Sequence, residues 1–185
     1  MIKSIDAFLY KLINQGYTAE WLDFVMIKFS DKYFWIPLYV FLFIIIIKVF
    51  KKKAIIILLC LGLSVVASDR LTSGFLKPLI IRERPCHVVA LSPRVIDPCH
   101  DTGSMPSSHS ANHFAISVFL VLLFSKIQKF IKYSFFIWAF MVALSRVYCG
   151  VHYPTDVFIG GLIGAALGFT FFNLHQLIER KIKWA

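Results

Sequence analysis

The sequence predicts an all-α integral-membrane helical bundle with about five transmembrane helices and an N-terminal amphipathic helical segment. Of its 185 residues, 58% are hydrophobic and 19 are Phe, and its mean hydropathy is +0.73. This composition is too apolar for a soluble domain of that length. The formal net charge of +10 comes from basic residues clustered between apolar runs, a pattern that indicates membrane topology and anionic headgroups. We therefore expect membrane lipids as partners, and no nucleic acid.

Residues 1–32 are expected to form two amphipathic helices at the membrane surface. Apolar residues recur at helical spacing on one face of the first helix, and polar residues occupy the other: Ile5, Phe8, Leu9, Leu12 and Ile13 against Lys3, Asp6, Lys11 and Asn14. Gly16 should end this helix, and Thr18 is a candidate cap for a second one. The alternative is that both helices only pack against the bundle.

Residues 33–185 form the predicted transmembrane domain, which carries five apolar runs. These runs cover approximately residues 33–50, 54–69, 107–125, 133–149 and 155–175. Basic clusters at residues 48–53, 126–132 and 180–183 mark one side as cytoplasmic by the positive-inside rule. We therefore expect a multi-pass protein of a bacterial-type inner membrane, with its polar motifs facing the periplasm or exterior.

Eight polar residues flank the apolar runs on that outer side. They comprise three cations, two hydroxyls, two histidines and one carboxylate: Lys77, Arg84, Arg146, Ser107, Ser108, His109, His152 and Asp156. Charged groups at membrane depth are costly, so they indicate function. This combination favours phosphoryl transfer, because cations and hydroxyls can bind the phosphate oxygens, as can the N-terminus of a helix that starts after Pro106.

His152 and Asp156 lie four residues apart, a spacing at which a carboxylate can hold one imidazole nitrogen while the other attacks phosphorus. His109 is the other titratable group suited to protonating the leaving oxygen, and later to deprotonating the water that cleaves the phosphohistidine. This chemistry needs no metal and no cofactor. The competing interpretation assigns these residues no catalytic role. Arg146 would reach the lipid headgroups, His152 would lie on the surface, and Asp156 would lie in the first turn of the next helix.

Three motifs in these segments resemble the type-2 phosphatidic acid phosphatase family of integral-membrane lipid phosphatases, which is related to vanadium haloperoxidases. Lys-x6-Arg-Pro stands at residues 77–85, and Ser-Arg-x5-His-x3-Asp stands at residues 145–156. Pro-Ser-Gly-His stands at residues 106–109, with Ser108 in place of the glycine. Members of this family commonly carry six spans, so the amphipathic N-terminal segment would stand where others have an additional helix.

The leading hypothesis is a metal-independent phosphatase that removes a terminal phosphoryl group from a lipid. Undecaprenyl diphosphate, phosphatidylglycerophosphate, phosphatidate and a lipid A phosphate are all compatible substrates. A phosphotransferase of the same family would pass the phosphoryl group to an acceptor other than water. The alternative from another class is a non-catalytic protein that binds anionic lipid through Lys77, Arg84 and Arg146, which would need neither histidine.

The remaining cysteine and histidine pairs have competing interpretations. Cys86-His87 and Cys99-His100 have the composition of a zinc site, but adjacent Cys-His pairs rarely present both side chains to one ion. On the outer side of a membrane we expect a Cys86–Cys99 disulfide, with two free thiols as the alternative. His113 is expected to be packed or hydrogen-bonded rather than to bind a metal.

Overall fold

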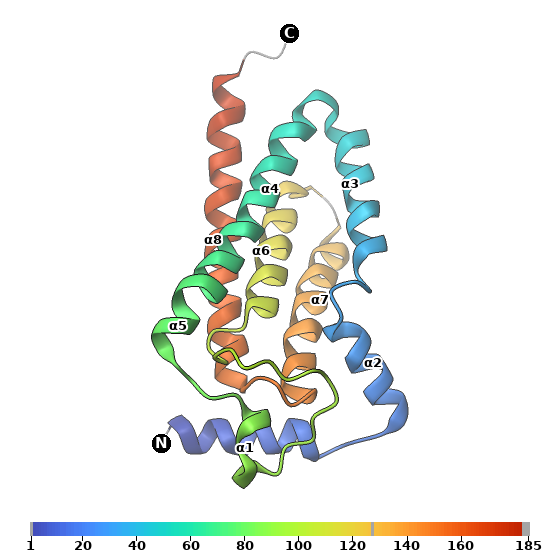
Figure 1. Cartoon of the computed structure of the whole chain (residues 1–185). Coiled ribbons are helices and arrows are strands. Elements are labelled where there is room, and N and C mark those ends of the chain that lie inside the picture. Colours follow the sequence, from blue (N-terminus) through green and yellow to red (C-terminus); the bar gives the residue numbers. More distant parts are fainter. Residues whose placement is uncertain (1, 127, 183–185) are drawn as a thin grey trace.

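A computed structural model describes residues 2–126 and 128–182, and these residues form helices and loops, with no strand among them. The predicted all-α class is confirmed. Five long helices run side by side (Figure 1): α3 (Ile36–Phe50), α4 (Ala54–Asp69), α6 (Ser108–Leu123), α7 (Lys129–Tyr148) and α8 (Pro154–Lys181). Lys183 of the third basic cluster lies outside the described residues.

The helices coincide with the five predicted apolar runs, but three of them extend further; α7 begins at Lys129, four residues before the expected start. α4 continues through a π-helix, η2 (Arg70–Leu76), into α5 (Lys77–Ile80), and the backbone at both junctions is helical. α8 continues beyond the expected end at residue 175 to Lys181, because Glu, Arg and Lys are good helix formers and need no apolar run. The extension of α4 places Lys77 near the end of one helical rod.

Large apolar side chains cover the outside of this bundle. On α3, for example, Phe41 and Val49 are more than half exposed, as are Ile137 on α7 and Leu162 on α8. Exposed apolar surface on this scale is typical of contact with a membrane. By length and composition, α7 and α8 could cross a membrane, and α6 is a shorter apolar helix.

A row of glycines brings α8 close to α6. Ideal Cβ atoms on Gly160, Gly164 and Gly168 would come to 2.3, 1.9 and 2.4 Å from the carbonyl oxygens of Ser107, Ala111 and Ala115. Small residues at every fourth position let two helices approach closely. This seam positions the second motif against the third, and the Ser107 N–H donates a hydrogen bond to the Asp156 carbonyl oxygen at 2.9 Å.

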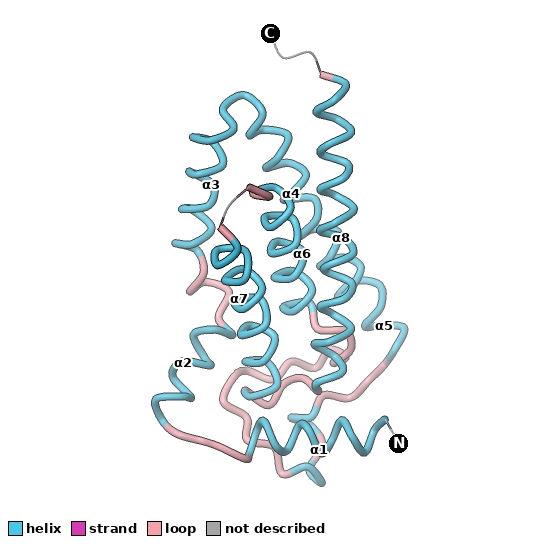
Figure 2. Tube along the Cα trace, turned by 180° about the vertical axis from the view of Figure 1, so that it is seen from behind, coloured by secondary structure: helices cyan, strands magenta, loops and turns pink. Residues whose placement is uncertain are grey.

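The N-terminal helix α1 (Ile2–Gln15) lies across one end of the bundle (Figures 1 and 2). Its polar stripe faces the protein: Asp6, Tyr10 and Asn14 are buried, whereas Phe8 and Leu12 are 67% and 58% exposed. The Asn14 amide donates to the Arg94 carbonyl oxygen at 2.7 Å and to the Tyr148 carbonyl oxygen of α7 at 2.8 Å. The apolar stripe is therefore free to enter a membrane while the polar stripe holds the helix on the protein.

The second helix, α2 (Glu20–Ser30), connects α1 to α3 along the side of the bundle (Figure 1). The expectation that Thr18 caps it was wrong. Ala19 occupies the N-cap position, and no side chain there bonds the first turn. Glu20 and Asp23 in the first turn instead provide negative charge at the N-terminus of the helix.

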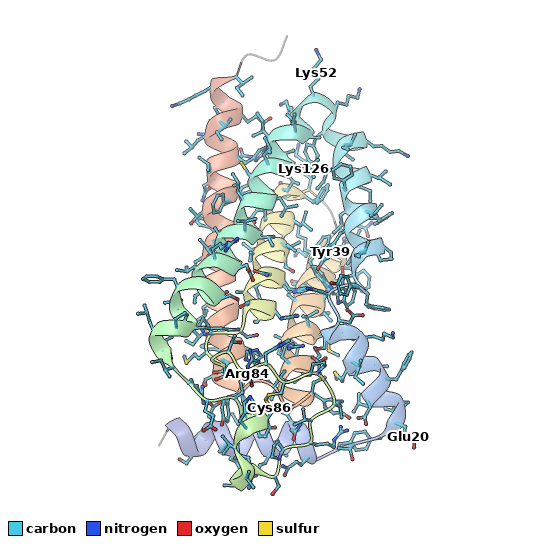
Figure 3. The ribbon with its side chains drawn as sticks, viewed as in Figure 1. Glu20, Tyr39, Lys52, Arg84, Cys86 and Lys126 are labelled. Carbon is cyan, nitrogen blue, oxygen red and sulfur yellow. A yellow bond between two sulfur atoms is a disulfide. The ribbon has the colours of Figure 1, made fainter. Side chains whose placement is uncertain are left out.

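The long loop over residues 81–107 crosses the end of the bundle beside α1 (Figure 2). It contains two short 3-10 helices, η3 (Pro85–His87) and η4 (Val89–Leu91). Cys86 and Cys99 are joined in a disulfide, which confirms the preferred interpretation over two free thiols or a zinc site. Figure 3 places Cys86 near Arg84, at the end of the molecule opposite Lys52 and Lys126.

Candidate active site

A cavity of about 680 Å³ lies between α3, α4 and α6. Six of the eight predicted site residues line it: Lys77, Arg84, Ser108, His109, Arg146 and His152. The other two, Ser107 and Asp156, are fully buried beside it. The three motifs, separated in sequence, therefore meet at one place.

The third motif spans the turn between α7 and α8. Two consecutive backbone N–H groups, those of Val151 and His152, donate to the Arg146 carbonyl oxygen, each at 3.2 Å. Gly150 has φ +86°, and a Cβ there would come to 2.5 Å from the Arg94 carbonyl oxygen. Only glycine meets both conditions. The tight turn directs the His152 side chain back toward the cavity.

His152 lies between a carboxylate and a cation. Its Nδ1 lies 3.4 Å from Asp156 Oδ2, and its Nε2 lies 3.4 Å from Arg84 Nη1. Arginine can only donate, so Nε2 is the acceptor and we assign the proton to Nδ1, facing the carboxylate. The lone pair of the imidazole is thus on Nε2, on the side of the cations.

The surroundings of His152 also favour the neutral form. Burial lowers the pKa of His152 well below its ordinary value, and the positive charges of Arg146, Arg84 and Lys77 lower it further. Asp156 is held in turn, since the Tyr153 N–H donates to Oδ2 at 2.8 Å. A neutral imidazole with a lone pair directed at an anion site is the form that a nucleophilic histidine requires.

Arg84 is anchored by the long loop. Its Nε donates to the Thr102 carbonyl oxygen at 2.8 Å, its Nη2 to the Thr102 hydroxyl at 3.1 Å, and its Nη1 to the Val151 carbonyl oxygen at 3.1 Å. These bonds fix the guanidinium beside His152, where it lines the cavity. Burial lowers the pKa of Arg84, but a guanidinium stays charged in proteins.

Arg146 is held from the other side of the cavity. Its Nη1 donates to Asp97 Oδ2 at 2.5 Å and also to the Ser30 hydroxyl. Its Nε is buried and has no partner among the described residues. A buried donor of a charged group without a partner is costly, and it is available to a phosphate oxygen.

The second motif supplies the start of α6, whose N-cap residue is Ser107. The Ser107 hydroxyl is buried and has no partner within the described part of the chain. The Ser108 hydroxyl, in the place of the motif glycine, lies 2.6 Å from the Ser73 hydroxyl of η2. The substitution therefore adds a contact to η2, and His109 lines the cavity one residue later.

His113 is packed and hydrogen-bonded, as expected. Its Nδ1 lies 2.8 Å from the His109 carbonyl oxygen, so Nδ1 is the donor. Its Nε2 consequently accepts from the Tyr39 hydroxyl at 3.1 Å, and its ring packs on Trp138 at 4.9 Å. Both ring nitrogens are occupied, which leaves no lone pair for a metal.

Sequence reasoning missed two residues that contact the site from behind. Arg82 Nη1 lies 2.7 Å from Asp156 Oδ1, and Asp97 pairs with Arg146. Arg82 falls in the unspecified part of Lys-x6-Arg, and Asp97 lies in a proline-rich loop without periodicity. The available signal was only that a buried cluster of positive charge needs carboxylates nearby.

Comparisons with known proteins identify the family of the chain. A family model described as the PAP2 superfamily matches residues 53–180. The lipid A 4′-phosphatase of Bacteroides thetaiotaomicron is 31% identical over 185 residues, covering 97% of this chain and 81% of that protein.

Two solved structures also resemble the chain. Aquifex aeolicus LpxE has a TM-score of 0.67 at 30% identity, covering 89% of this chain and 93% of that one. A transmembrane PAP2-type phosphatidylglycerolphosphate phosphatase from Bacillus subtilis has a TM-score of 0.67 at 28% identity, covering 98% of this chain and 88% of that one. The family indicated by the three motifs is thus confirmed, and the chain belongs to the PAP2 superfamily.

Proposed function

We propose that this chain hydrolyses the terminal phosphoryl group of a lipid phosphate through a covalent phosphohistidine, with a lipid A 4′-phosphate as the first substrate candidate. The chain is a hydrolase of lipid phosphates, as its relatives are. The observation that carries the mechanism is the arrangement of His152, with Nδ1 toward Asp156 and Nε2 at the cationic cavity. A protein that only binds anionic lipid has no use for this arrangement.

In the proposed first step, His152 Nε2 attacks phosphorus and the bond from phosphorus to the lipid oxygen breaks. His109 gives its proton to that oxygen, so the lipid alcohol, or lipid monophosphate from a diphosphate, leaves with that oxygen protonated. In the second step His109 takes a proton from water, which attacks phosphorus and breaks the bond to Nε2. Inorganic phosphate leaves, and both histidines return to their starting forms.

Positive charge from the protein accompanies both steps. Lys77, Arg84 and Arg146 line the cavity around the reacting nitrogen, and the first N–H groups of α6 add to their field. Such groups stabilise the charge on the three equatorial oxygens of the transferring phosphoryl group. We therefore propose that hydrolysis does not require a metal ion.

The shape of the cavity favours a lipid over a small soluble phosphate. From Asp69 near the phosphate end it follows α4 to Leu58, about 16 Å at 1.5 Å per residue. Its further walls on α3 and α6 are apolar, with Leu42, Ile46 and Ile116 among them. We propose that the headgroup phosphate lies at the cations while an acyl chain occupies this apolar part. The Bacteroides thetaiotaomicron relative named above, a lipid A 4′-phosphatase, favours a lipid A phosphate.

We further propose that α3, α4, α6, α7 and α8 all cross the inner membrane, with α1 and α2 at its outer interface. Lys52 and Lys126 lie at the end opposite Arg84 (Figure 3). By the positive-inside rule the lysine end faces the cytoplasm, so the candidate active site faces the periplasm. The exposed apolar stripe of α1 is directed suitably for such an interface.

The test is phosphate release by purified protein in detergent, with excess chelator, from lipid A 4′-phosphate, undecaprenyl diphosphate, phosphatidylglycerophosphate and phosphatidate. We expect release from at least one lipid, fastest from lipid A, and none from His152→Ala. Failure with every lipid would contradict the function, and strict dependence on an added divalent ion would contradict the metal-free mechanism. Transfer of the phosphoryl group to an added alcohol, without release of inorganic phosphate, would make the chain a phosphotransferase.

A further inference from the structure

The carboxylate of Asp156 is bound on both oxygens. Oδ2 faces His152 and accepts from the Tyr153 N–H. Oδ1 accepts from Arg82 Nη1 at 2.7 Å. Arg82 belongs to the irregular start of the long loop, where no helix orients it. Some other contact must hold its side chain.

That contact comes from the N-terminal helix. Arg82 Nη2 pairs with Asp6 Oδ2 of α1, and the guanidinium lies 4.0 Å above the Tyr153 ring. Asp6 is almost fully buried, with 1% of its side chain exposed, whereas Arg82 is 22% exposed. Without Asp6, the guanidinium of Arg82 would keep one carboxylate partner and an open side toward water.

Thr155 closes the network from α8. Its hydroxyl donates to Asp6 Oδ2 at 2.6 Å and accepts from Arg82 Nη1 at 2.7 Å. Its backbone N–H donates to Asp6 Oδ1 at 3.0 Å. Four groups from three separate segments thus form one chain of charge-assisted hydrogen bonds that ends at Asp156. Such bonds are stronger than neutral ones and directional.

The network lies behind the candidate active site. Neither Asp6 nor Arg82 belongs to the lining of the cavity that His109 and His152 share. Asp6 is therefore placed to influence the reaction only through other residues. Carboxylates that hold a reactive imidazole depend on their own partners for orientation.

We infer that Asp6 is a positioning residue for Asp156, acting through Arg82 and Thr155, so that α1 is part of the catalytic apparatus and not only a membrane contact. This inference rests on the role proposed above for Asp156. It predicts that removing the charge of Asp6 slows the chemical step while leaving substrate binding intact.

The test compares Asp6→Asn with Asp23→Asn in the full-length protein. Both carboxylates lie on N-terminal helices and pair with an arginine of the long loop; Asp23 accepts from Arg94 at 2.7 and 2.8 Å. Asp6→Asn should lower kcat for a lipid phosphate about tenfold or more, the scale for residues that orient a reacting group, with KM nearly unchanged. Asp23→Asn should leave kcat unchanged.

A second variant separates positioning from general loosening. Thr155→Val removes the bridging hydroxyl with little change in volume, and it should also lower kcat. This variant keeps the inference testable if Asp6→Asn does not fold. Combined with Asp6→Asn, its effect should not multiply, because both changes cut the same connection. Multiplying losses would overturn the inference.

Asp156→Asn distinguishes this inference from the mechanism beneath it. If Asp156→Asn is inactive while Asp6→Asn keeps the kcat of the unmodified protein, the inference is wrong and the mechanism stands. Equal loss of kcat in Asp6→Asn and Asp23→Asn would also overturn the inference. Full activity of Asp156→Asn would overturn both.

Discussion

Asp97 holds Arg146 from the side away from the phosphate site, with Oδ2 at 2.5 Å from Nη1 and the Ser30 hydroxyl at the same nitrogen. The third-motif arginine therefore does not offer all its donors to substrate. One end of the guanidinium is bound by the long loop and α2, and its Nε remains buried without a partner in the described part of the chain. A phosphate oxygen would satisfy that donor.

Asp97→Asn should destabilise the protein, because it removes the negative partner of an arginine that is only 4% exposed. We expect a loss of about 1.5–3 kcal/mol, the range for hydrogen bonds to charged groups. Inorganic phosphate should raise the melting temperature of the variant more than that of the unmodified protein, since the anion replaces the missing charge. Asp101→Asn, at a fully exposed carboxylate of the same loop, should change neither the stability nor the increase in melting temperature that phosphate causes. An unchanged melting temperature in Asp97→Asn would contradict the importance of this pair.

Substitution of His152 and substitution of His109 should impair different parts of the reaction. His152→Ala should form no phosphoenzyme with any substrate, because it lacks the attacking nitrogen. His109→Ala should lower the rate of phosphoryl transfer from a lipid monoester about 10²-fold or more, because the alkoxide leaving group needs a proton.

An activated aryl phosphate separates these roles, since its leaving group departs without protonation. In single-turnover measurements with this substrate, His109→Ala should still become phosphorylated and His152→Ala should not. Equal loss of that step in both variants would remove the assignment of acid and nucleophile.

The positions of the proposed catalytic groups could be predicted from the sequence, whereas the residues that hold them could not. Apolar runs and motif spacing are local properties, so they located the five helices and brought Arg84, His109 and His152 to one end. The partners Asp6, Arg82 and Asp97 reach the site through tertiary contacts of α1 and of a loop without periodicity. The amphipathic pattern of α1 predicted a helix, but periodicity alone does not say that buried polar residues would attach it to the protein.

The pH dependence of kcat/KM should depend on Arg84. Burial and the cations of Arg146, Arg84 and Lys77 lower the pKa of His152, so the imidazole should remain neutral and active below the ordinary histidine pKa of about 6.5. Arg84→Gln removes one of those cations and raises the pKa of His152. Protonation would then inactivate the nucleophile at a higher pH, so the acid limb of the kcat/KM profile should move to higher pH. Lys126→Gln, at the opposite end of the molecule, should leave the limb in place; an unmoved limb in Arg84→Gln would contradict the coupling.

The glycine seam between α6 and α8 should tolerate no side chain at its centre. A Cβ on Gly164 would come to 1.9 Å from the Ala111 carbonyl oxygen, so Gly164→Ala must separate the helices that carry the second and third motifs. We expect a loss of about 1–3 kcal/mol, the usual cost of overpacking, measured by thermal unfolding in detergent. Gly62→Ala on α4 is the matched control, because its Cβ meets nothing within 4 Å and alanine favours a helix. A seam variant as stable as this control would show that α6 and α8 can separate without cost.

The proposed orientation can be tested with single introduced cysteines, since the two free native thiols, Cys60 and Cys149, are buried. Val89, in the long loop, is 88% exposed, and Lys129 begins α7 at the opposite end of the bundle. If the basic clusters face the cytoplasm, a membrane-impermeant thiol reagent added to intact cells should label Val89→Cys and not Lys129→Cys. Permeabilised cells should label both, which controls for reactivity of each thiol. Labelling of Lys129→Cys alone in intact cells would reverse the orientation and assign the substrate to the cytoplasmic leaflet, because Arg84, which lines the cavity, lies at the other end of the molecule.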